Sequence, residues 1–438
     1  MLNESLSIGK SPTLDKAHIN PHVAQLGISG TLAINERCNQ LIKDGKTVYK
    51  FGLGQSPFPV PVPVVEALRL FAHEKDYLPV KGLPALREAV AFFHRKKDLV
   101  DVAPESVLIG PGSKELLFLL QLVFNGQIII TGPSWVSYRP QARILNKKIS
   151  VLHTSFEDKW KIDPEKLRAV RKGKTHIPAF LILNYPGNPD GVTYTYDELQ
   201  ALAETARKTN IFILSDEIYG QLHHRGQHVS IARYYPEGTV ISSGLSKWCG
   251  AGGWRLGTFS FPRKLQWLAT AMAAVASETY TSVSAPIQYA AVRAFEGGIK
   301  IEEYLCHARR ILSKLGTHCA SRLAAADVRV HMPEGGFYLF LEFSNHVHRL
   351  RQKGLTTSAL LCEKLLEDTG VALLPGQAFN RPDEEFSARM AYVDFDGARA
   401  LAASEIIPLD EHLPDDFLPT YCGKVLEGVE HLLRWLQE

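Results

Sequence analysis

A lysine surrounded by small residues is the strongest candidate for a chemically active group in this chain. Lys247 lies in the stretch SSGLSKWCGAGG (242–253), and Arg255 follows shortly after it. Small neighbours let a bulky ligand reach the amine, and a lysine in such a pocket can lose its proton and attack a carbonyl. The guanidinium fork of Arg255 suits a phosphate. The pair predicts a ligand with both an aldehyde and a phosphate, such as pyridoxal phosphate. Taken alone, the same stretch would also suit a plain surface loop.

Two upstream stretches strengthen this interpretation. They are NYPGNPDG (184–191) and LSDEIY (214–219), and GWRLG (253–257) follows the lysine. In this order the three motifs resemble those of the class I/II aminotransferases, pyridoxal-phosphate enzymes of fold type I. The resemblance extends from about Ser29 to the C-terminus and is greatest to the bacterial aspartate aminotransferase subgroup. It implies the fold, the cofactor and the roles of several residues.

Three of these residues would carry the catalysis. The resemblance implies that Lys247 binds the cofactor covalently and, once freed, moves a proton between the substrate α-carbon and the cofactor. Asp216 ends an expected strand, and a carboxylate at the carboxyl end of a strand points into the ligand crevice of an open α/β sheet. There it would pair with the pyridine nitrogen. Tyr219 and Asn188 would hydrogen-bond the cofactor's ring oxygen. Without the resemblance, a helix N-cap aspartate and a core tyrosine would be the better interpretations.

A small-residue turn is the expected site for the cofactor's phosphate. Residues of this turn open an apolar helix, whose N-terminus offers backbone N–H groups and the positive end of the helix dipole. By resemblance, the phosphate contacts are Gly112, Ser113, Lys114, Arg255, and Ser246 or Ser243. Relatives often carry a hydroxyl where Gly244 stands, so the choice between the two serines stays open. Tyr77 resembles the tyrosine that reaches the neighbouring subunit's phosphate, which implies a homodimer with shared active sites.

Other residues are expected to hold the ring and the substrate. Trp135 resembles the aromatic residue that stacks on the cofactor, an interaction worth about 1 kcal/mol beyond burial. Arg389 is placed like the arginine that binds the substrate α-carboxylate with a bidentate fork, although Arg381 is nearby. Gly54 resembles the glycine whose backbone meets the same carboxylate, and Trp135 and Asn188 would also touch the substrate.

Composition excludes several other classes of protein. The net charge of +3 over 438 residues gives no argument for nucleic-acid or membrane binding. Six cysteines without a CxxC pair favour reduced thiols, and hence a cytoplasmic location. The histidines at 223, 224 and 228 have no nearby cysteine or acid in a ligand pattern, so no metal is expected. The absence of GxGxxG after any strand disfavours a nicotinamide dehydrogenase.

Alternating strands and helices predict an α/β fold with a mostly parallel sheet between helices, plus a smaller α+β domain. The expected domains are an N-terminal arm with part of the small domain (1–60), a large cofactor-binding domain (61–305) and a small C-terminal domain (306–438). Residues 286–315 are predicted to be one long helical region and 328–332 a strand. The proline-containing stretch 402–420 is interpreted as an inserted loop whose role stays open.

The function predicted is that of a pyridoxal-phosphate-dependent aminotransferase. It would move an amino group from an L-amino acid, with aspartate the first choice, to a 2-oxo acid such as 2-oxoglutarate. No arginine in 280–288 obviously offers itself to a distal carboxylate, so aromatic or alanine-type donors stay open. Another reaction of the same cofactor, such as C–S β-elimination, is the nearest alternative, because one carbanion leads to both outcomes. A cofactor-binding regulator without turnover is a third alternative, disfavoured because no basic helix-turn-helix precedes Gly54.

Overall fold

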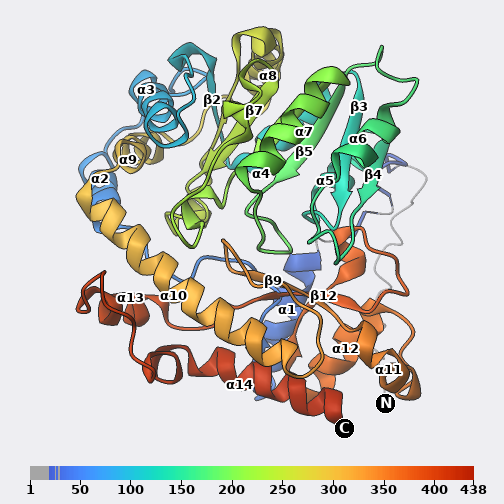
Figure 1. Cartoon of the computed structure of the whole chain (residues 1–438). Coiled ribbons are helices and arrows are strands. Elements are labelled where there is room, and N and C mark those ends of the chain that lie inside the picture. The colour runs from blue at the N-terminus through green and yellow to red at the C-terminus, as the bar shows by residue number, and fades with distance from the viewer. Residues whose placement is uncertain (1–18, 25, 28–29) are drawn as a thin grey trace, which may run out of the picture.

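Seven strands form the central sheet of the structure, a computed structural model that describes residues 19–24, 26–27 and 30–438 (Figure 1). The strand order is β2-β8-β7-β6-β5-β3-β4. Only β8 runs antiparallel to its neighbours, which confirms the mostly parallel sheet. The strands are β2 (Val107–Gly110), β3 (Gln127–Gly132), β4 (Ile149–His153), β5 (Ala179–Asn184), β6 (Ile211–Asp216), β7 (Thr239–Gly244) and β8 (Gly257–Ser260). The expected N-terminal arm lies mostly outside the described residues.

Alternate residues of the central strands bury their side chains on opposite faces of the sheet. In β6, Phe212 and Leu214 pack with one set of helices, while Ile211 and Ile213 pack with the other. Each such fully buried side chain contributes about 1.5–3 kcal/mol relative to exposure. The first face carries α4 (Ser113–Val123), α5 (Tyr138–Ile144) and α8 (Gln266–Glu278), and the second carries α6 (Pro164–Arg171) and α7 (Tyr196–Lys208). Both faces are therefore covered, as a parallel sheet requires.

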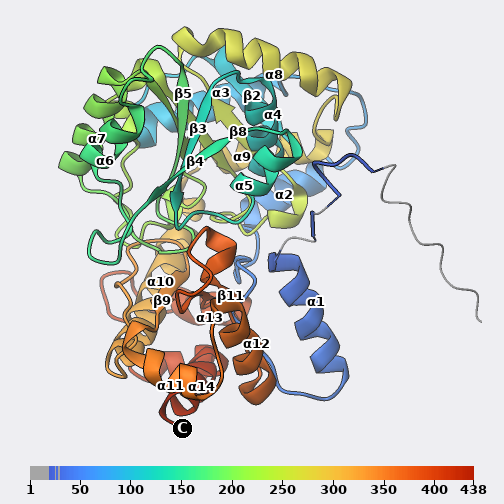
Figure 2. The same cartoon turned by 90° about the vertical axis from the view of Figure 1, so that its right-hand side faces the viewer.

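Two small sheets lie below the large one (Figures 1 and 2). One is antiparallel, in the order β11-β12-β9, and the other pairs β1 with β10 in parallel. β1 comes before the large sheet in the sequence and pairs with β10, which comes after it. The N-terminal segment therefore joins the C-terminal part of the fold. The strands are β1 (Tyr49–Lys50), β9 (Tyr338–Glu342), β10 (Val371–Ala372), β11 (Leu374–Pro375) and β12 (Ser387–Ala391).

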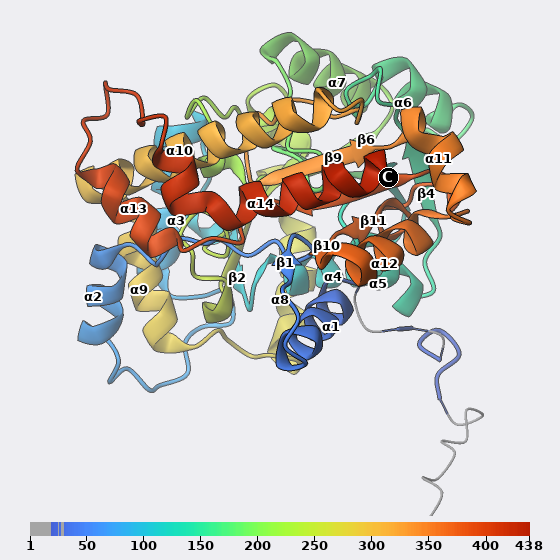
Figure 3. The same ribbon diagram turned by 90° about the horizontal axis from the view of Figure 1, so that it is seen from below.

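Long helices surround these small sheets. Seen from below, α14 crosses in front of β9 (Figure 3). The helices of this part are α1 (Gly30–Lys43), α10 (Ile299–Ala324), α11 (Val347–Gln352), α12 (Ser358–Thr369), α13 (Gly397–Glu405) and α14 (Phe417–Gln437). Helices α2 (Val62–Leu70), α3 (Pro84–Phe93) and α9 (Ala285–Glu296) pack together beside the β2 edge of the large sheet. None of the helices in the described ranges is long and apolar enough to cross a membrane.

Two local predictions of secondary structure were wrong. The helical region 286–315 is divided between α9 and α10, because Gly297 and Gly298 have φ of 73° and 113°, which a right-handed helix cannot contain. The expected strand 328–332 makes a single bridge, between Arg329 and Glu342. In the same segment, His331 Nε2 hydrogen-bonds the Phe156 carbonyl at 2.8 Å, which is a contact outside any sheet.

The predicted insertion is shorter than expected. Residues 402–405 complete α13 and residues 417–420 begin α14, which leaves a loop at 406–416. Arg310 of α10 fixes this loop by donating hydrogen bonds to the carbonyls of Ile407 and Pro408 at 2.7 and 2.8 Å. The loop is therefore a surface element against α10. The division into domains stays a prediction, and its boundary at 305/306 falls inside α10.

Packing of α14 on β1 gives a direct test of this part of the fold. A Cβ added to Gly428 would lie 2.5 Å from Phe51 Cζ, whereas one added to Gly423 on the same helix would meet nothing within 4 Å. We expect Gly428→Ala to lower the free energy of unfolding by about 1–3 kcal/mol through overpacking. Gly423→Ala is the control and should be neutral or stabilising by up to about 1 kcal/mol. Denaturant titration measures both, and equal effects would contradict this packing.

Candidate active site

A cavity of about 450 Å³ opens where the carboxyl ends of β5, β6 and β7 face the small antiparallel sheet. Eleven of the predicted site residues line it: Gly54, Ser113, Lys114, Trp135, Asn188, Asp216, Tyr219, Ser246, Lys247, Arg255 and Arg389. They come from positions across more than 300 residues of sequence. The fold thus brings together nearly the whole predicted set.

Three predicted residues do not line the cavity. Gly112 lies just behind it, where a Cβ would come within 2.2 Å of Arg255 Nη2, so only glycine leaves room for that guanidinium. Ser243 is buried within β7, whereas Ser246 lines the cavity. Tyr77 is 90% exposed, in the connection between α2 and α3. The cofactor contacts predicted for these residues stay predictions.

Asp216 is the acid at the centre of the cavity wall. It is the last residue of β6, and in the sheet register it lies opposite Asn184 of β5 and Ser242 of β7. The Tyr138 hydroxyl donates a hydrogen bond of 2.6 Å to one carboxylate oxygen, and Ser242 Oγ lies 3.3 Å from the other. Burial raises the pKa of Asp216 to about 6 despite these donors. A bound cation would reverse that shift, so the carboxylate is suited to a protonated ring nitrogen.

Lys247 projects into the cavity from the loop after β7. Its neighbours Leu245, Trp248 and Cys249 are buried, so they anchor the loop on both sides of the lysine. The ammonium donates to the Gly54 carbonyl at 2.7 Å and lies 5.7 Å from the ring centre of Tyr219. The amine is thus held between a backbone acceptor and an aromatic face, within reach of a ligand in the cavity.

The corner of the cavity at the N-terminus of α4 has the groups that an anion site requires. Arg255 has a left-handed φ of 54°, and Nη1 donates to the Gly252 carbonyl at 2.9 Å. Strained conformations of this kind persist where the surrounding structure fixes them. A Cβ on Gly257 would lie 2.2 Å from the Ser113 backbone nitrogen, so glycine lets β8 pack directly on the first turn of α4. Arg255, Ser246 and the first turn of α4 together suit a phosphate.

Lys114, in the same turn, adds a further cation. Burial lowers the pKa of Lys114, and the nearby charges of Arg255 and Lys247 lower it further. Its ammonium lies 5.3 Å from the ring centre of Trp135. Three cations close together, in a cavity whose only acid among the described lining residues is Asp216, favour the binding of an anion.

Arg389 is a buried arginine without an acidic partner among the described residues. Its side chain on β12 is 1% exposed, and the guanidinium donates to Asn188 Oδ1 at 3.0 Å and to the Gly52 carbonyl at 2.5 Å. Within the described part of the chain, its Nε has no hydrogen-bond partner. Because an unpaired buried charge is costly, a planar anion such as a carboxylate would stabilise this arrangement.

Arg381, the alternative arginine, has a different role. It pairs with Glu385 at 2.5 Å and donates to the carbonyls of Gly132 and Thr154, both at 2.8 Å. Its donors are therefore occupied by the protein itself, and it does not line the cavity. This contrast favours Arg389 as the carboxylate-binding arginine.

The histidines after β6 are used in the protein's own contacts. His228 Nε2 lies 2.8 Å from Glu217 Oε2, so the expectation that these histidines have no acidic neighbour was wrong. The ring of His224 contacts the carbonyls of Pro333 and Gly336. Within the described ranges, no group of three or more histidine, cysteine, aspartate or glutamate side chains could hold a metal.

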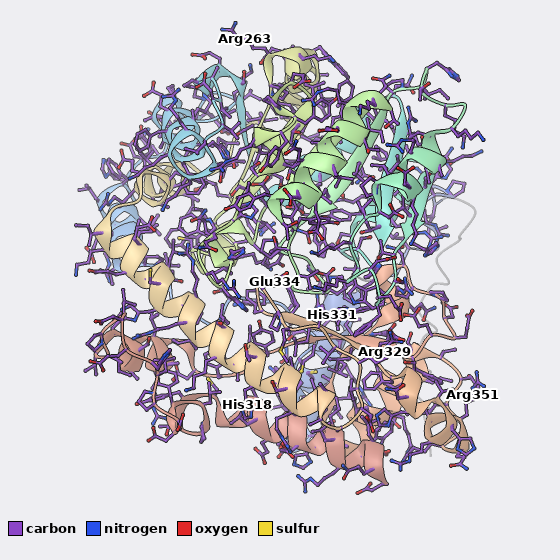
Figure 4. The ribbon with its side chains drawn as sticks, viewed as in Figure 1. Arg263, His318, Arg329, His331, Glu334 and Arg351 are labelled. Carbon is purple, nitrogen blue, oxygen red and sulfur yellow. The ribbon has the colours of Figure 1, made fainter. Side chains whose placement is uncertain are left out.

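Glu334 lies where the part with the large sheet meets the part with the small sheets (Figure 4), and it accepts the Thr193 backbone N–H at 2.9 Å. This contact ties the loop after β5 to the approach to β9.

Among the side chains that sequence reasoning missed, three make hydrogen bonds or ring contacts with the predicted site residues. Tyr138 supports Asp216, Asn184 bonds the Asp216 carbonyl at 2.7 Å, and Tyr338 contacts both Tyr219 and Arg389. Asn184 could have been found, because it ends the strand next to β6. Tyr338 lies in an apolar strand where nothing in the sequence separates it from a core tyrosine.

The raised pKa of Asp216 predicts a pH-dependent cost in the cofactor-free protein. Its carboxyl is neutral in both folded and unfolded chains below about pH 4, but the folded state resists ionisation until about pH 6. Stability is therefore lost as pH rises through this window. Relative to wild type, cofactor-free Asp216→Asn should gain about 2–3 kcal/mol between pH 4 and pH 7. Urea titrations across this range measure the difference, and a pH-independent difference would contradict the assignment.

Comparison with known proteins agrees with this geometry. Residues 46–396 match the model of the family described as aminotransferase class I and II. An aspartate aminotransferase of Geobacillus stearothermophilus is 32% identical over 379 residues, which cover 84% of this chain and 93% of the relative. An asparagine–oxo-acid transaminase of Streptococcus mutans is 31% identical over 85% of this chain and 94% of its own length.

Solved structures give the same result. An aspartate aminotransferase from Thermus thermophilus, determined with maleate, superposes with a TM-score of 0.80 at 26% identity, covering 95% of this chain and 99% of that one. The family match, over residues 46–396, includes every residue that lines the cavity except Leu32. This chain therefore belongs to the class I and II aminotransferases, which use pyridoxal 5′-phosphate as cofactor.

Proposed function

We propose that amino-group transfer takes place in the cavity beneath β5, β6 and β7, with L-aspartate as donor and a 2-oxo acid such as 2-oxoglutarate as acceptor. The balance of charge carries this proposal. Four cationic side chains, Lys114, Lys247, Arg255 and Arg389, line the cavity, and Asp216 is the only acidic residue among the described residues that line it. A phosphorylated cofactor and a dicarboxylic substrate would supply the missing negative charge.

The cavity fits the cofactor part by part. Arg255, Ser246 and the first turn of α4 would hold the phosphate, and Asp216 would bind the ring nitrogen. Gly112 and Gly257 leave the space that this corner needs. Bound there, pyridoxal phosphate supplies a ring that withdraws electrons from the substrate α-carbon. Asp216 keeps the ring nitrogen protonated, and Trp135 would lie against the ring.

Lys247 would serve twice. Its amine would hold the cofactor, and the same amine, when free, would move a proton between the substrate α-carbon and the cofactor's C4′. Arg389 would bind the substrate α-carboxylate with the Gly54 backbone close by. A fixed carboxylate sets which bond at the α-carbon stands perpendicular to the ring, so the proton is the group that leaves.

Lys114 is the feature that favours an acidic donor. Once Arg255, Lys247 and Arg389 have their partners, Lys114 is the cation left over in the cavity, beside Trp135. We assign it, in addition to its predicted cofactor contact, to the distal carboxylate. The printed name of the Geobacillus relative and the maleate in the Thermus structure, a dicarboxylate, support this choice. The Streptococcus relative supports asparagine as a second donor.

A donor panel tests the proposal. Single-turnover bleaching of the cofactor absorbance would be followed with L-aspartate, L-asparagine, L-alanine and L-phenylalanine, in wild type and in Lys114→Met. We expect kcat/KM for aspartate to fall about 10–100-fold in the variant, because a charge-assisted hydrogen bond is lost. Alanine should change by less than about 3-fold. Equal losses for both donors would limit Lys114 to the cofactor, and ammonia release would indicate elimination in place of transfer.

We further propose a homodimer in which Tyr77 of one subunit reaches the phosphate of its partner. Tyr77 is exposed and does not line the cavity of its own chain, which supports this assignment. Tyr77→Phe should then weaken cofactor binding about 10-fold, the loss expected for one hydrogen bond to a charged group, without changing the stability of the cofactor-free protein. Monomers that bind cofactor normally would contradict it.

We also propose a cytoplasmic location, which is supported by six cysteines that form no disulfide.

A further inference from the structure

Four side chains form a closed circuit on one wall of the cavity. Arg389 Nη1 donates to Asn188 Oδ1 at 3.0 Å, and Asn188 Nδ2 lies 3.4 Å from the Tyr219 hydroxyl. The Tyr219 and Tyr338 hydroxyls are 2.8 Å apart. The Tyr338 ring in turn lies 4.7 Å from the Arg389 guanidinium carbon. The circuit therefore links the carboxylate-binding arginine to the tyrosine predicted to bind the cofactor's ring oxygen.

The direction of each hydrogen bond in the circuit can be worked out from Arg389. A guanidinium has donors and no acceptor, so the Asn188 oxygen must face it. The amide nitrogen of Asn188 is thereby turned to Tyr219 and donates to it. One of the two acceptor positions on the Tyr219 oxygen is filled in this way.

Tyr338 decides what happens to the single Tyr219 proton. If Tyr219 donated to Tyr338, no proton would be left for a ligand in the cavity. If Tyr338 donates, both acceptor positions of Tyr219 are filled, and its own O–H points away from both partners. No other hydrogen bond of the Tyr338 hydroxyl is found among the described residues, so its proton has no competing acceptor there.

The position of Tyr338 is fixed from two sides. A Cβ on Gly54 would lie 1.9 Å from the Tyr338 hydroxyl, so only glycine lets the phenol approach the backbone that accepts the Lys247 ammonium. Tyr338 is 1% exposed, and its ring also packs against Phe337. The hydroxyl is therefore held beside Tyr219 and Lys247 without freedom to turn to solvent.

We infer that Tyr338 is a positioning residue whose hydroxyl donates to Tyr219 and turns the Tyr219 proton towards the ring oxygen of the bound cofactor. The inference rests on the site assignment proposed above. A hydroxyl that accepts hydrogen bonds becomes a stronger donor. Tyr338 therefore strengthens the bond from Tyr219 to the ring oxygen, although it does not touch the cofactor itself.

The test is the pH midpoint of the visible absorbance change of the cofactor-loaded protein, measured without substrate. Tyr219→Phe should raise this midpoint by about 1–2 pH units, because the variant loses one hydrogen bond to the charged ring oxygen of the cofactor. Tyr338→Phe should raise the midpoint by about 0.3 pH units, because losing the hydrogen bond from Tyr338 weakens, but does not remove, the bond from Tyr219 to the ring oxygen. In the double variant the Tyr338→Phe change should add nothing, because its effect passes through Tyr219. Tyr304→Phe is the matched control, since Tyr304 is a buried tyrosine of α10 whose hydroxyl has no hydrogen-bond partner in the ranges that the structure describes.

Each other outcome counts against a defined part of the account. No shift in Tyr219→Phe would overturn the proposed site and the inference together. A shift in Tyr219→Phe but none in Tyr338→Phe would overturn the inference alone, as would an additive shift in the double variant or an equal shift in Tyr304→Phe. Should Tyr338→Phe fail to fold, a fluorinated tyrosine at position 338 replaces it. As a stronger donor of the same shape it must lower the midpoint, and a midpoint that stays or rises would overturn the inference.

Discussion

The cavity contains more positive charge than the protein neutralises, and the rest of the structure is arranged around that imbalance. Arg389 is buried and has no acidic partner among the described residues, and Lys114 lies near two other cations. Such charges are unfavourable in an empty site, because burial strips them of water. They become favourable when phosphate and carboxylate groups arrive. The site is thus built to gain free energy on binding anions, and the binding itself orients the reacting bonds.

This arrangement needs both parts of the fold. The large parallel sheet supplies Asp216 and Lys247 near the ends of neighbouring strands, and the small antiparallel sheet supplies Arg389 and Tyr338 from facing strands. The contact from Glu334 to Thr193 and that from Arg389 to Asn188 join the two parts at the cavity. A carboxylate bound at Arg389 would therefore be linked through Asn188 to Tyr219, beside the position proposed for the cofactor.

Much of the site could be predicted because its residues occur in short motifs. Lys247, Arg255 and Asn188 stand in distinctive sequence contexts, and Asp216 could be placed from the end of a buried strand. The corner proposed for the phosphate, at the first turn of α4, could be predicted because a small-residue turn opens that helix. Tyr138 and Tyr338 could not be found in this way, because their partners lie far away in sequence and their surroundings resemble ordinary core. The break at Gly297 and Gly298 was missed because a helical pattern continues on both sides of it.

The central claim is that Lys247 is the amine that carries the cofactor in this cavity. Borohydride reduction of the cofactor-loaded protein, followed by peptide mass mapping, tests it most directly, because reduction fixes the cofactor on whichever lysine holds it. The account predicts one modified lysine, Lys247, and no comparable labelling in Lys247→Ala. Labelling spread over exposed lysines, or concentrated on Lys114, would contradict the account.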